Sequence, residues 1–315
     1  MRIKTVIGWL FLLGLLVSGA LLSVLTGPGC FHRGEIGSLL YFRLPRMTIG
    51  IIAGGVLALV GCSLQGIMRN PLVDPWTLGV ASGAAFGVSL TIVTGVQGSL
   101  ALPVSAIIGA ALAIGFVYLL AGSGINLTVT RLVLSGVIVN FFFSSVVMLM
   151  LILGRHTLGE AVYLMMGSLG VVYTAKSFWL LVGCGIVAVL GCGWLFFHSR
   201  ELDIISLNEE TAVSLGIDAV KMIRMTFLVG SVAVGLVVAW TGAISFVGLV
   251  VPHIVRMLFG PRHSIVLPGS FVLGAGLLLY ADTLVRNLAP SGLPLSVVTA
   301  LVGVPFFIYL LRKSQ

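Results

Sequence analysis

Few side chains in this sequence could carry out chemistry, and those few are widely separated. Two histidines stand near an arginine, in the order His253, Arg256 and His263, but no third metal ligand accompanies them. None of the four lysines lies in a G-x-x-x-x-G-K-[ST] loop, so the chain cannot hydrolyse ATP by itself. A paired nucleophile and base is also missing. We therefore expect no catalytic residue, no metal site and no cofactor bound to this chain.

Two further groups are best interpreted as structural. Asp282 is the lone acid of its apolar segment, and Arg286 follows one helical turn later, so an i to i+4 ion pair is the simplest interpretation. A proton-relay carboxylate would have to lie deeper in the membrane without such a partner. Cysteines at metal-ligand spacing are absent, and we predict no disulfide among Cys30, Cys62, Cys184 and Cys192.

The longest polar stretch runs from His198 to Arg224 and holds five of the nine acidic residues. Both of its flanks are long enough to cross a bilayer, so the stretch must lie in water. Its apolar residues recur at mixed helical spacings, and Ser206 followed by Glu209 and Glu210 resembles an N-cap with a capping box. Short amphipathic helices in water usually bind a partner, although a connector that packs only on its own membrane domain is the alternative.

The elements that position these residues are membrane spans. Of 315 residues 59% are hydrophobic and 8% are charged, and the mean hydropathy of +1.20 indicates a polytopic membrane protein. A helix needs about 20 residues to cross the hydrocarbon core, which leaves room for about ten spans. We predict a single all-α domain over residues 1–315, with spans at 5–25, 47–67, 76–96, 99–121, 131–153, 177–197, 222–241, 243–257, 265–285 and 297–311.

The basic residues indicate the orientation of this bundle. With the amino terminus in the cytoplasm, eleven of the 17 basic residues fall in cytoplasmic segments and six fall outside. We therefore expect both termini and the polar stretch to be cytoplasmic. The formal charge of +8 then reflects membrane topology and not a nucleic acid partner. The apolar run after Arg2 and Lys4 is too long for a signal peptide, so we expect it to be kept as the first span.

Small residues and prolines predict how the spans pack and where they end. Two prolines and Asp74 in the turn 69–76 predict that the second span stops there and that Asp74 caps the next helix. Glycine-rich stripes at four-residue spacing predict close helix contacts along Gly50, Gly54, Ala58, Cys62 and Gly66 in span two, and along Gly79, Gly83 and Gly87 in span three.

Two spans contain features that are typical of transporters. The run from Met225 to Phe259 is too long for one untilted span, and Thr241-Gly242, Gly248 and Pro252 predict a break in it. Polar groups interrupt span five at Ser135, Asn140, Ser144 and Ser145. They either line a water-filled passage or form hydrogen bonds to neighbouring helices.

Five segments along nearly the whole chain form a recognisable series. They are RLPR at 43–46, LQGIMRNPLVDPWTLGVASGAAFG at 64–87, EETAVSLG at 209–216, FVGLVVPHIVRMLFGPRH at 246–263 and LPLSVVTALVGVPFFIYLL at 293–311. In this order they resemble the FecCD family, the permease subunits of ATP-driven importers for iron siderophores, heme and vitamin B12. The resemblance implies the type II ABC importer permease fold with ten helices.

The resemblance also implies partners and a location. It implies a homodimer of permeases in a bacterial or archaeal cytoplasmic membrane, although the second subunit could be a paralogue. Two cytoplasmic ABC ATPase subunits would bind ATP and Mg²⁺, and an extracytoplasmic substrate-binding protein would deliver a metal chelate. The segment 202–220 would form coupling helices that contact the ATPase through Leu207, Glu209, Glu210, Ala212, Leu215 and Gly216.

At the outer surface, the resemblance implies that Arg43, Arg46 and Arg286 dock acidic residues of the binding protein, the alternative being that they anchor lipid headgroups. Span five, with Ser135, Asn140 and Ser144, would line the passage at the dimer axis, and the turn 122–130 would lie near the cytoplasmic gate. The segment 163–169 fits the family pattern without indicating a ligand.

Two other classes of function have less support. An ion-coupled secondary transporter of a small solute usually needs buried ionisable residues, and Asp282 is the only candidate. An intramembrane enzyme would need the catalytic pair or the metal ligands that the sequence lacks. We therefore expect a non-catalytic permease subunit that takes up an iron-siderophore, heme or cobalamin.

Overall fold

The structure is a computed structural model, and it describes residues 2–26, 36–122, 128–153, 167–170, 175–288 and 293–313. Within these ranges every regular element is a helix. The turn 122–130 and the segment 163–169 lie partly outside the described residues, and Cys30 lies outside them entirely.

Ten of the described helices correspond to the ten predicted spans. Seven are long and apolar enough to cross a membrane, namely α1 (Arg2–Leu25), α2 (Ile36–Ile67), α4 (Ala101–Ala121), α5 (Val129–Leu153), α7 (Ala175–Phe197), α10 (Ala219–Thr241) and α12 (His263–Leu288). Three shorter apolar helices are α3 (Val80–Thr94), α11 (Val247–Phe259) and α13 (Leu295–Lys313). The remaining elements are a short 3₁₀ helix, η1 (Pro75–Leu78), and two polar helices, α8 (Ser199–Leu207) and α9 (Glu209–Ser214).

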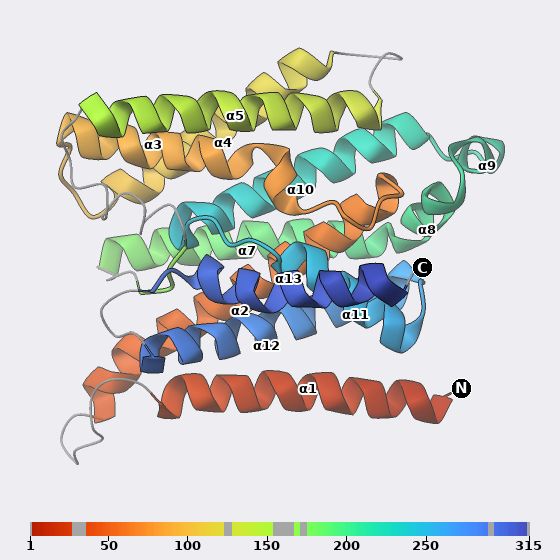
Figure 1. Cartoon of the computed structure of the whole chain (residues 1–315), viewed down its shortest axis with the longest axis horizontal. Helices are drawn as coiled ribbons and strands as arrows, with labels where there is room; N and C mark the ends of the chain where they lie inside the picture. Colours follow the sequence, from red (N-terminus) through yellow and green to blue (C-terminus); the bar gives the residue numbers. More distant parts are fainter. Residues whose placement is uncertain are drawn as a thin grey trace.

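The apolar helices run roughly side by side in one bundle (Figure 1). Helix α1 lies along one edge against α12, and α5 lies along the opposite edge with α3 and α4. The first residues of α1 and the last residues of α13 lie at the end of the bundle that carries α8 and α9. We call this end the loop end, and the other the opposite end.

Glycine allows the central helices to touch backbone to backbone. A Cβ atom on Gly54 of α2 would overlap the carbonyl group of Gly274 of α12, and a Cβ on Gly274 would overlap Gly54. A side chain on Gly83 of α3 would likewise meet the backbone of α4. The predicted close contacts are confirmed at these positions. Gly79 is different, because its φ of 74° places it in a left-handed turn between η1 and α3.

The predicted break in the run 225–259 lies between α10 and α11. Gly242 ends α10 with a φ of 66°, and Phe246, which precedes α11, has a φ of 69° that is rare for a residue with a side chain. Asp74 stabilises this turn because its Oδ2 accepts a hydrogen bond from the Phe246 amide at 3.1 Å. Its Oδ1 accepts from the Trp76 amide at 3.2 Å, so the prediction that Asp74 caps the next helix is confirmed for η1.

Pro252 and Gly248 do not break the chain as predicted, because both lie within α11. A proline inside a helix leaves the carbonyl four residues earlier without its amide donor. Here Gln65 of α2 replaces that donor, because its Nε2 donates to the Gly248 carbonyl at 3.2 Å and to the Leu249 carbonyl at 3.3 Å. Arg256 of α11 in turn donates from Nη1 to Gln65 Oε1 at 2.5 Å. The helix therefore continues through its proline.

Candidate functional site

The polar stretch folds into α8 and α9, which follow directly after α7 at the loop end (Figure 1). Helix α8 is amphipathic, and it buries Leu202 and Ile205 completely. It packs with this apolar face against α2 and α12. Helix α9 buries only Ala212. The two helices are thus attached to the bundle by one face and open to solvent on the other.

The predicted N-cap at Ser206 is wrong. Ser206 lies in the last turn of α8, where its Oγ donates to the Asp203 carbonyl at 2.7 Å. The cap of α9 is Asn208, whose extended backbone and side-chain oxygen suit that position and whose Oδ1 accepts from the Glu210 amide at 3.0 Å. The sequence contained this signal, because asparagine is as good a cap as serine.

Three large apolar side chains of α8, of α9 and of the residue directly after α9 are exposed to solvent. The exposed fractions are 77% for Leu207, 64% for Val213 and 63% for Leu215. We call these three residues the apolar patch. Single exposed apolar side chains are ordinary on a protein surface, but several that gather outside the membrane mark an interaction site. Val213 was not among the coupling residues predicted from the sequence, because the motif around it does not distinguish inward from outward positions.

The other predicted coupling residues differ in their accessibility. Glu210 and Gly216 are exposed, and Gly216 has a φ of 79° in the turn after α9. Glu209 is half-buried and forms an ion pair of 2.6 Å with Arg69, which follows α2. Ala212 is fully buried within the chain, so it supports α9 and does not reach a partner.

Asp203 attaches α8 to the first residue of α12. Its Oδ1 accepts from the His263 main-chain amide at 2.8 Å and lies 2.6 Å from His263 Nδ1. The carboxylate thus caps the amino terminus of α12 from a different helix. Partial burial alone would raise the pKa of Asp203, but the His263 hydrogen bonds and the nearby positive charges outweigh it, so this pKa lies below its ordinary value.

At the opposite end two arginines contact one carboxylate, and a third arginine lies near them. Arg46 of α2 makes a bidentate contact with Asp282 of α12, with Nη2 to Oδ1 at 2.7 Å and Nε to Oδ2 at 3.0 Å. Arg286 forms the predicted i to i+4 pair with Asp282, with Nε to Oδ2 at 3.1 Å. Arg43 lies nearby and donates to the Val24 carbonyl at 2.6 Å. We call these four residues the arginine cluster.

The arginine cluster is mostly inside the protein. Arg43 and Arg286 are buried, and Arg286 donates to the Ser23 carbonyl at 3.0 Å near the end of α1. Arg46 keeps 23% of its side chain exposed, against 2% for Asp282. The sequence predicted three surface arginines, whereas the structure brings them together and leaves mainly Arg46 accessible. Asp282 is paired with two cations, which is the opposite of the unpaired state that a proton relay requires.

The three polar residues predicted to line a passage differ in their exposure on α5. Ser135 is buried against its own chain, Asn140 is half-buried, and Ser144 is exposed. The side-chain oxygen of Asn140 is buried without a hydrogen-bond partner in the described part of the chain. Only Ser144, with its neighbour Ser145, lies on the face of α5 that this chain leaves uncovered.

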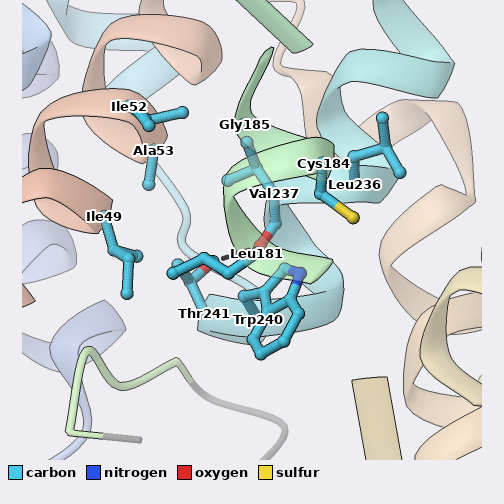
Figure 2. A pocket seen from close by; sticks show the side chains of 10 residues that line it. All are labelled: Ile49, Ile52, Ala53, Leu181, Cys184, Gly185, Leu236, Val237, Trp240 and Thr241. Atoms are coloured by element: carbon cyan, nitrogen blue, oxygen red, sulfur yellow. Dashed lines mark hydrogen bonds between the residues drawn. The ribbon is translucent and has the colours of Figure 1, made fainter. Parts of the chain in front are cut away.

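Two cavities between the helices are lined mostly by apolar side chains. One has a volume of about 20 Å³ and is lined by α2, α7 and α10. Figure 2 shows its lining side chains, among them Cys184, Trp240 and Thr241. A groove of about 400 Å³ between α2 and α7 shares Ile49 and Leu181 with it. Their polar lining is limited to Trp240 and Thr241 in the first and Thr48 in the second, which is little for binding a metal chelate. In the described ranges no three His, Cys, Asp or Glu side chains come together to hold a metal ion.

A bundle of apolar spans, with polar helices at one end and the arginine cluster at the other, defines the class of multi-pass membrane proteins. Residues 6–313 match the FecCD transport family model, and the chain belongs to that family. Among its relatives, it is 37% identical to the cobalamin import system permease protein BtuC of Halobacterium salinarum over 87% of this chain and 73% of the relative.

Further relatives have different stated substrates. The chain is 36% identical to the vitamin B12 import system permease protein BtuC of Salmonella typhi, over 97% of this chain and 95% of the relative. It is also 36% identical to the hemin transport system permease protein HmuU of Yersinia pestis, over 88% and 83% of the two chains. A solved structure of an inward-facing metal-chelate type ABC transporter matches with a TM-score of 0.85 and 32% identity, covering 96% of this chain and 98% of that one.

The expected class is therefore confirmed. The chain is a non-catalytic permease of the ABC importers for metal chelates, and it is a multi-pass membrane protein.

Proposed function

We propose that this permease forms a homodimer in a bacterial or archaeal cytoplasmic membrane and imports a metal chelate, an iron-siderophore, heme or cobalamin. Two ABC ATPase subunits would bind at the loop end, and a substrate-binding protein would deliver the chelate at the opposite end. The observation that carries this proposal is the apolar patch on two polar helices that stand outside the apolar bundle. Both termini would then be cytoplasmic, together with α8 and α9.

Helices α8 and α9 have the properties of an element that binds an ATPase. The apolar patch would fill a groove of the partner, while the buried face of α8 fixes the helix to α2 and α12. A force applied at the patch would therefore reach the bundle. ATP and Mg²⁺ would be held by the ATPase, and this chain would contribute no cofactor ligand.

The arginine cluster is suited to an acidic partner. Two guanidinium groups contact the Asp282 carboxylate and a third, that of Arg43, lies near them, which leaves two positive charges in excess at the opposite end. Such a field steers an acidic surface toward it and fixes its orientation more than it adds affinity. Arg46 would contact the partner directly, because it is the most accessible of the three. The buried Arg43 and Arg286 would add to the positive potential at this surface.

The uncovered face of α5 supports a passage between two copies. Ser144 and Ser145 are exposed there, among large apolar side chains such as Phe141 and Leu149. The Ser145 hydroxyl donates to the Phe141 carbonyl at 2.8 Å, and in a lone copy both hydroxyl groups would face lipid, where polar groups are less favourable than along a water-filled passage. A second copy would convert this face into the wall of a passage, with Asn140 at its border and Ser135 supporting it from within.

Replacing Leu215 with aspartate tests the ATPase assignment. A charge in the apolar patch should prevent association with the ATPase, because a carboxylate would have to be buried without a partner. Leu215→Met is the matched control, since it keeps apolar volume at the same position. Co-purification of the ATPase with the wild type and the Met variant, but not with the Asp variant, is expected. Equal recovery with all three chains would contradict this proposal.

Replacing Arg46 with glutamine tests the docking assignment. The association rate of the binding protein should fall, and the loss should be largest at low ionic strength, where charges act over longer distances. Surface-immobilised permease in nanodiscs allows this rate to be measured over a series of salt concentrations. Thr48→Ser, at a nearby position of α2, is the control. A rate that is unchanged at every ionic strength would exclude electrostatic docking through Arg46.

A further inference from the structure

Helices α2 and α12 are in contact along nearly their whole length. A Cβ atom on Gly50 would lie 2.9 Å from the side chain of Leu279, and one on Gly55 would lie 2.6 Å from Phe271. Between these positions Gly54 and Gly274 touch through their backbones. Helices this close cannot slide past each other without separating first, because their surfaces interlock. The pair is therefore expected to move as one body.

Polar contacts join the same two helices at the opposite end. The bidentate contact between Arg46 and Asp282 fixes α2 to α12 in both distance and orientation. Asp282 is almost fully buried, so water weakens this ion pair little. Any movement of α12 at this end therefore carries Arg46 with it.

At the loop end His263 forms a junction of three helices. Its ring belongs to α12, and its Nε2 would lie 2.5 Å from a Cβ atom on Gly66 of α2, so the ring fills the place of a side chain there. Its Nδ1 and main-chain amide both contact Asp203 of α8. The ring is thus held between α2 and α8, with its Nε2 buried.

We infer that α2 and α12 form a rigid strut, and that Asp203 is the positioning residue that transmits movement of α8 through His263 to the arginine cluster. This inference rests on the proposed function, because it assumes that the ATPase acts on α8 and α9 and that the binding protein docks at the opposite end. According to this inference, the contact between Asp203 and His263 connects the nucleotide state of the ATPase to the affinity for the binding protein. The ion pair of Arg69 with Glu209 is exposed, and it is a secondary link.

The test compares the affinity of the assembled complex for its binding protein with and without a non-hydrolysable ATP analogue. In wild type the ratio of these two affinities reports transmission from ATPase to docking surface. Asp203→Ala removes both contacts to His263 and should reduce this ratio by about tenfold. Asp203→Asn keeps an oxygen for the main-chain amide, so it should reduce the ratio by only about threefold. Glu201→Gln, on the same helix, is the matched control and should leave the ratio unchanged.

The outcomes separate this inference from the proposed function. A wild-type chain that does not assemble with its ATPase contradicts the proposed function. The inference is overturned if the assembled wild-type complex has the same affinity with and without the ATP analogue. It is also overturned if the Ala variant keeps the wild-type ratio. Equal losses in the Ala, Asn and Gln variants would also overturn it, because they would indicate a nonspecific effect on α8. If the Ala variant does not assemble, the Asn variant is measured in its place. A wild-type ratio of affinities in the Asn variant would then overturn the inference.

Discussion

Asp282 neutralises two arginines that lie on different helices, and it is almost completely buried while doing so. Removing a carboxylate from such a site leaves its cations without compensation, which costs more than the original pair contributed. The same residue therefore holds α2, α12 and, through Arg286, the end of α1 in place. Its role in the fold is separate from any role of the arginines in docking.

Asp282→Asn is expected to lower the free energy of unfolding by about 3 kcal/mol, because Arg46 and Arg286 would remain partly buried with a neutral partner. Denaturant titration of the purified permease in mild detergent measures this difference. Glu210→Gln, at an exposed position, is the control and should change stability by less than about 0.5 kcal/mol. Identical midpoints for the two variants would show that the cluster does not stabilise the bundle.

The Asp203 contact predicts a specific pH dependence. The pKa of Asp203 is lowered by folding, so its stabilising contribution is present above the pKa of the unfolded chain and is lost as pH falls through the folded value. Wild type should therefore be more stable than Asp203→Asn at neutral pH, and this difference should disappear as pH falls below about 4. Melting temperatures of the two proteins across this range provide the measurement. A difference that persists undiminished in acid would show that the charge of Asp203 is not its source.

The burial of Arg43 and Arg286 could not be predicted from the sequence. The sequence places both in short motifs next to spans, where an arginine at the membrane surface is the usual expectation. Arg43 donates to the main-chain carbonyl of Val24 and Arg286 to that of Ser23, both in α1. Asp282 is more than two hundred residues from Arg43 along the chain. The i to i+4 pair of Asp282 with Arg286 could be predicted, because it depends only on local helix geometry.

Apolar run length accounts for the success of the predicted helices. Each of the ten spans corresponds to a described helix, because a bilayer requires about 20 apolar residues per crossing and the chain has little else between its turns. The details of the ends were less predictable. Pro252 lies inside α11 because Gln65, from a distant helix, replaces its missing donor, and no local pattern indicates such a replacement.

Gln65→Met would remove this donor while keeping a side chain of similar size. The carbonyls of Gly248 and Leu249 and the guanidinium of Arg256 would each lose a partner, so we expect a loss of about 2 kcal/mol in stability. Amide hydrogen exchange should show where stability is lost. The increase in exchange rate over the wild type should be larger in α11 than in α7. Unchanged exchange in α11 would mean that water satisfies these groups without Gln65.

Close packing of α2 on α12 makes a further prediction at the scale of elements. Gly54→Ala should destabilise the protein by about 1–3 kcal/mol, because its Cβ would overlap the backbone of Gly274. Gly193→Ala in α7 is the matched control, since a Cβ there meets nothing within 4 Å, and it should be neutral or slightly stabilising. The two variants can be compared by the same denaturant titration. Equal behaviour would indicate that the helices have room to separate.

For the whole molecule, family membership and the fold together define an importer permease, while its partners are proposed from the surfaces at its two ends. The sequence motifs indicated the family, because they extend over most of the chain. By resemblance they implied an ATPase at 202–220 and a second copy at span five, but they did not indicate which single side chains, such as Val213, would be exposed. An ion-coupled transporter, the alternative that the sequence left open, would draw its energy from an ion gradient instead of ATP.

Uptake into proteoliposomes tests the central claim most directly. The permease is reconstituted with its ATPase and binding protein, and accumulation of a metal chelate is measured with internal ATP, or with a proton or sodium gradient and no ATP. We predict that wild type accumulates the chelate only with ATP and that Leu215→Asp abolishes this uptake. Accumulation driven by an ion gradient in the absence of the ATPase would contradict the account.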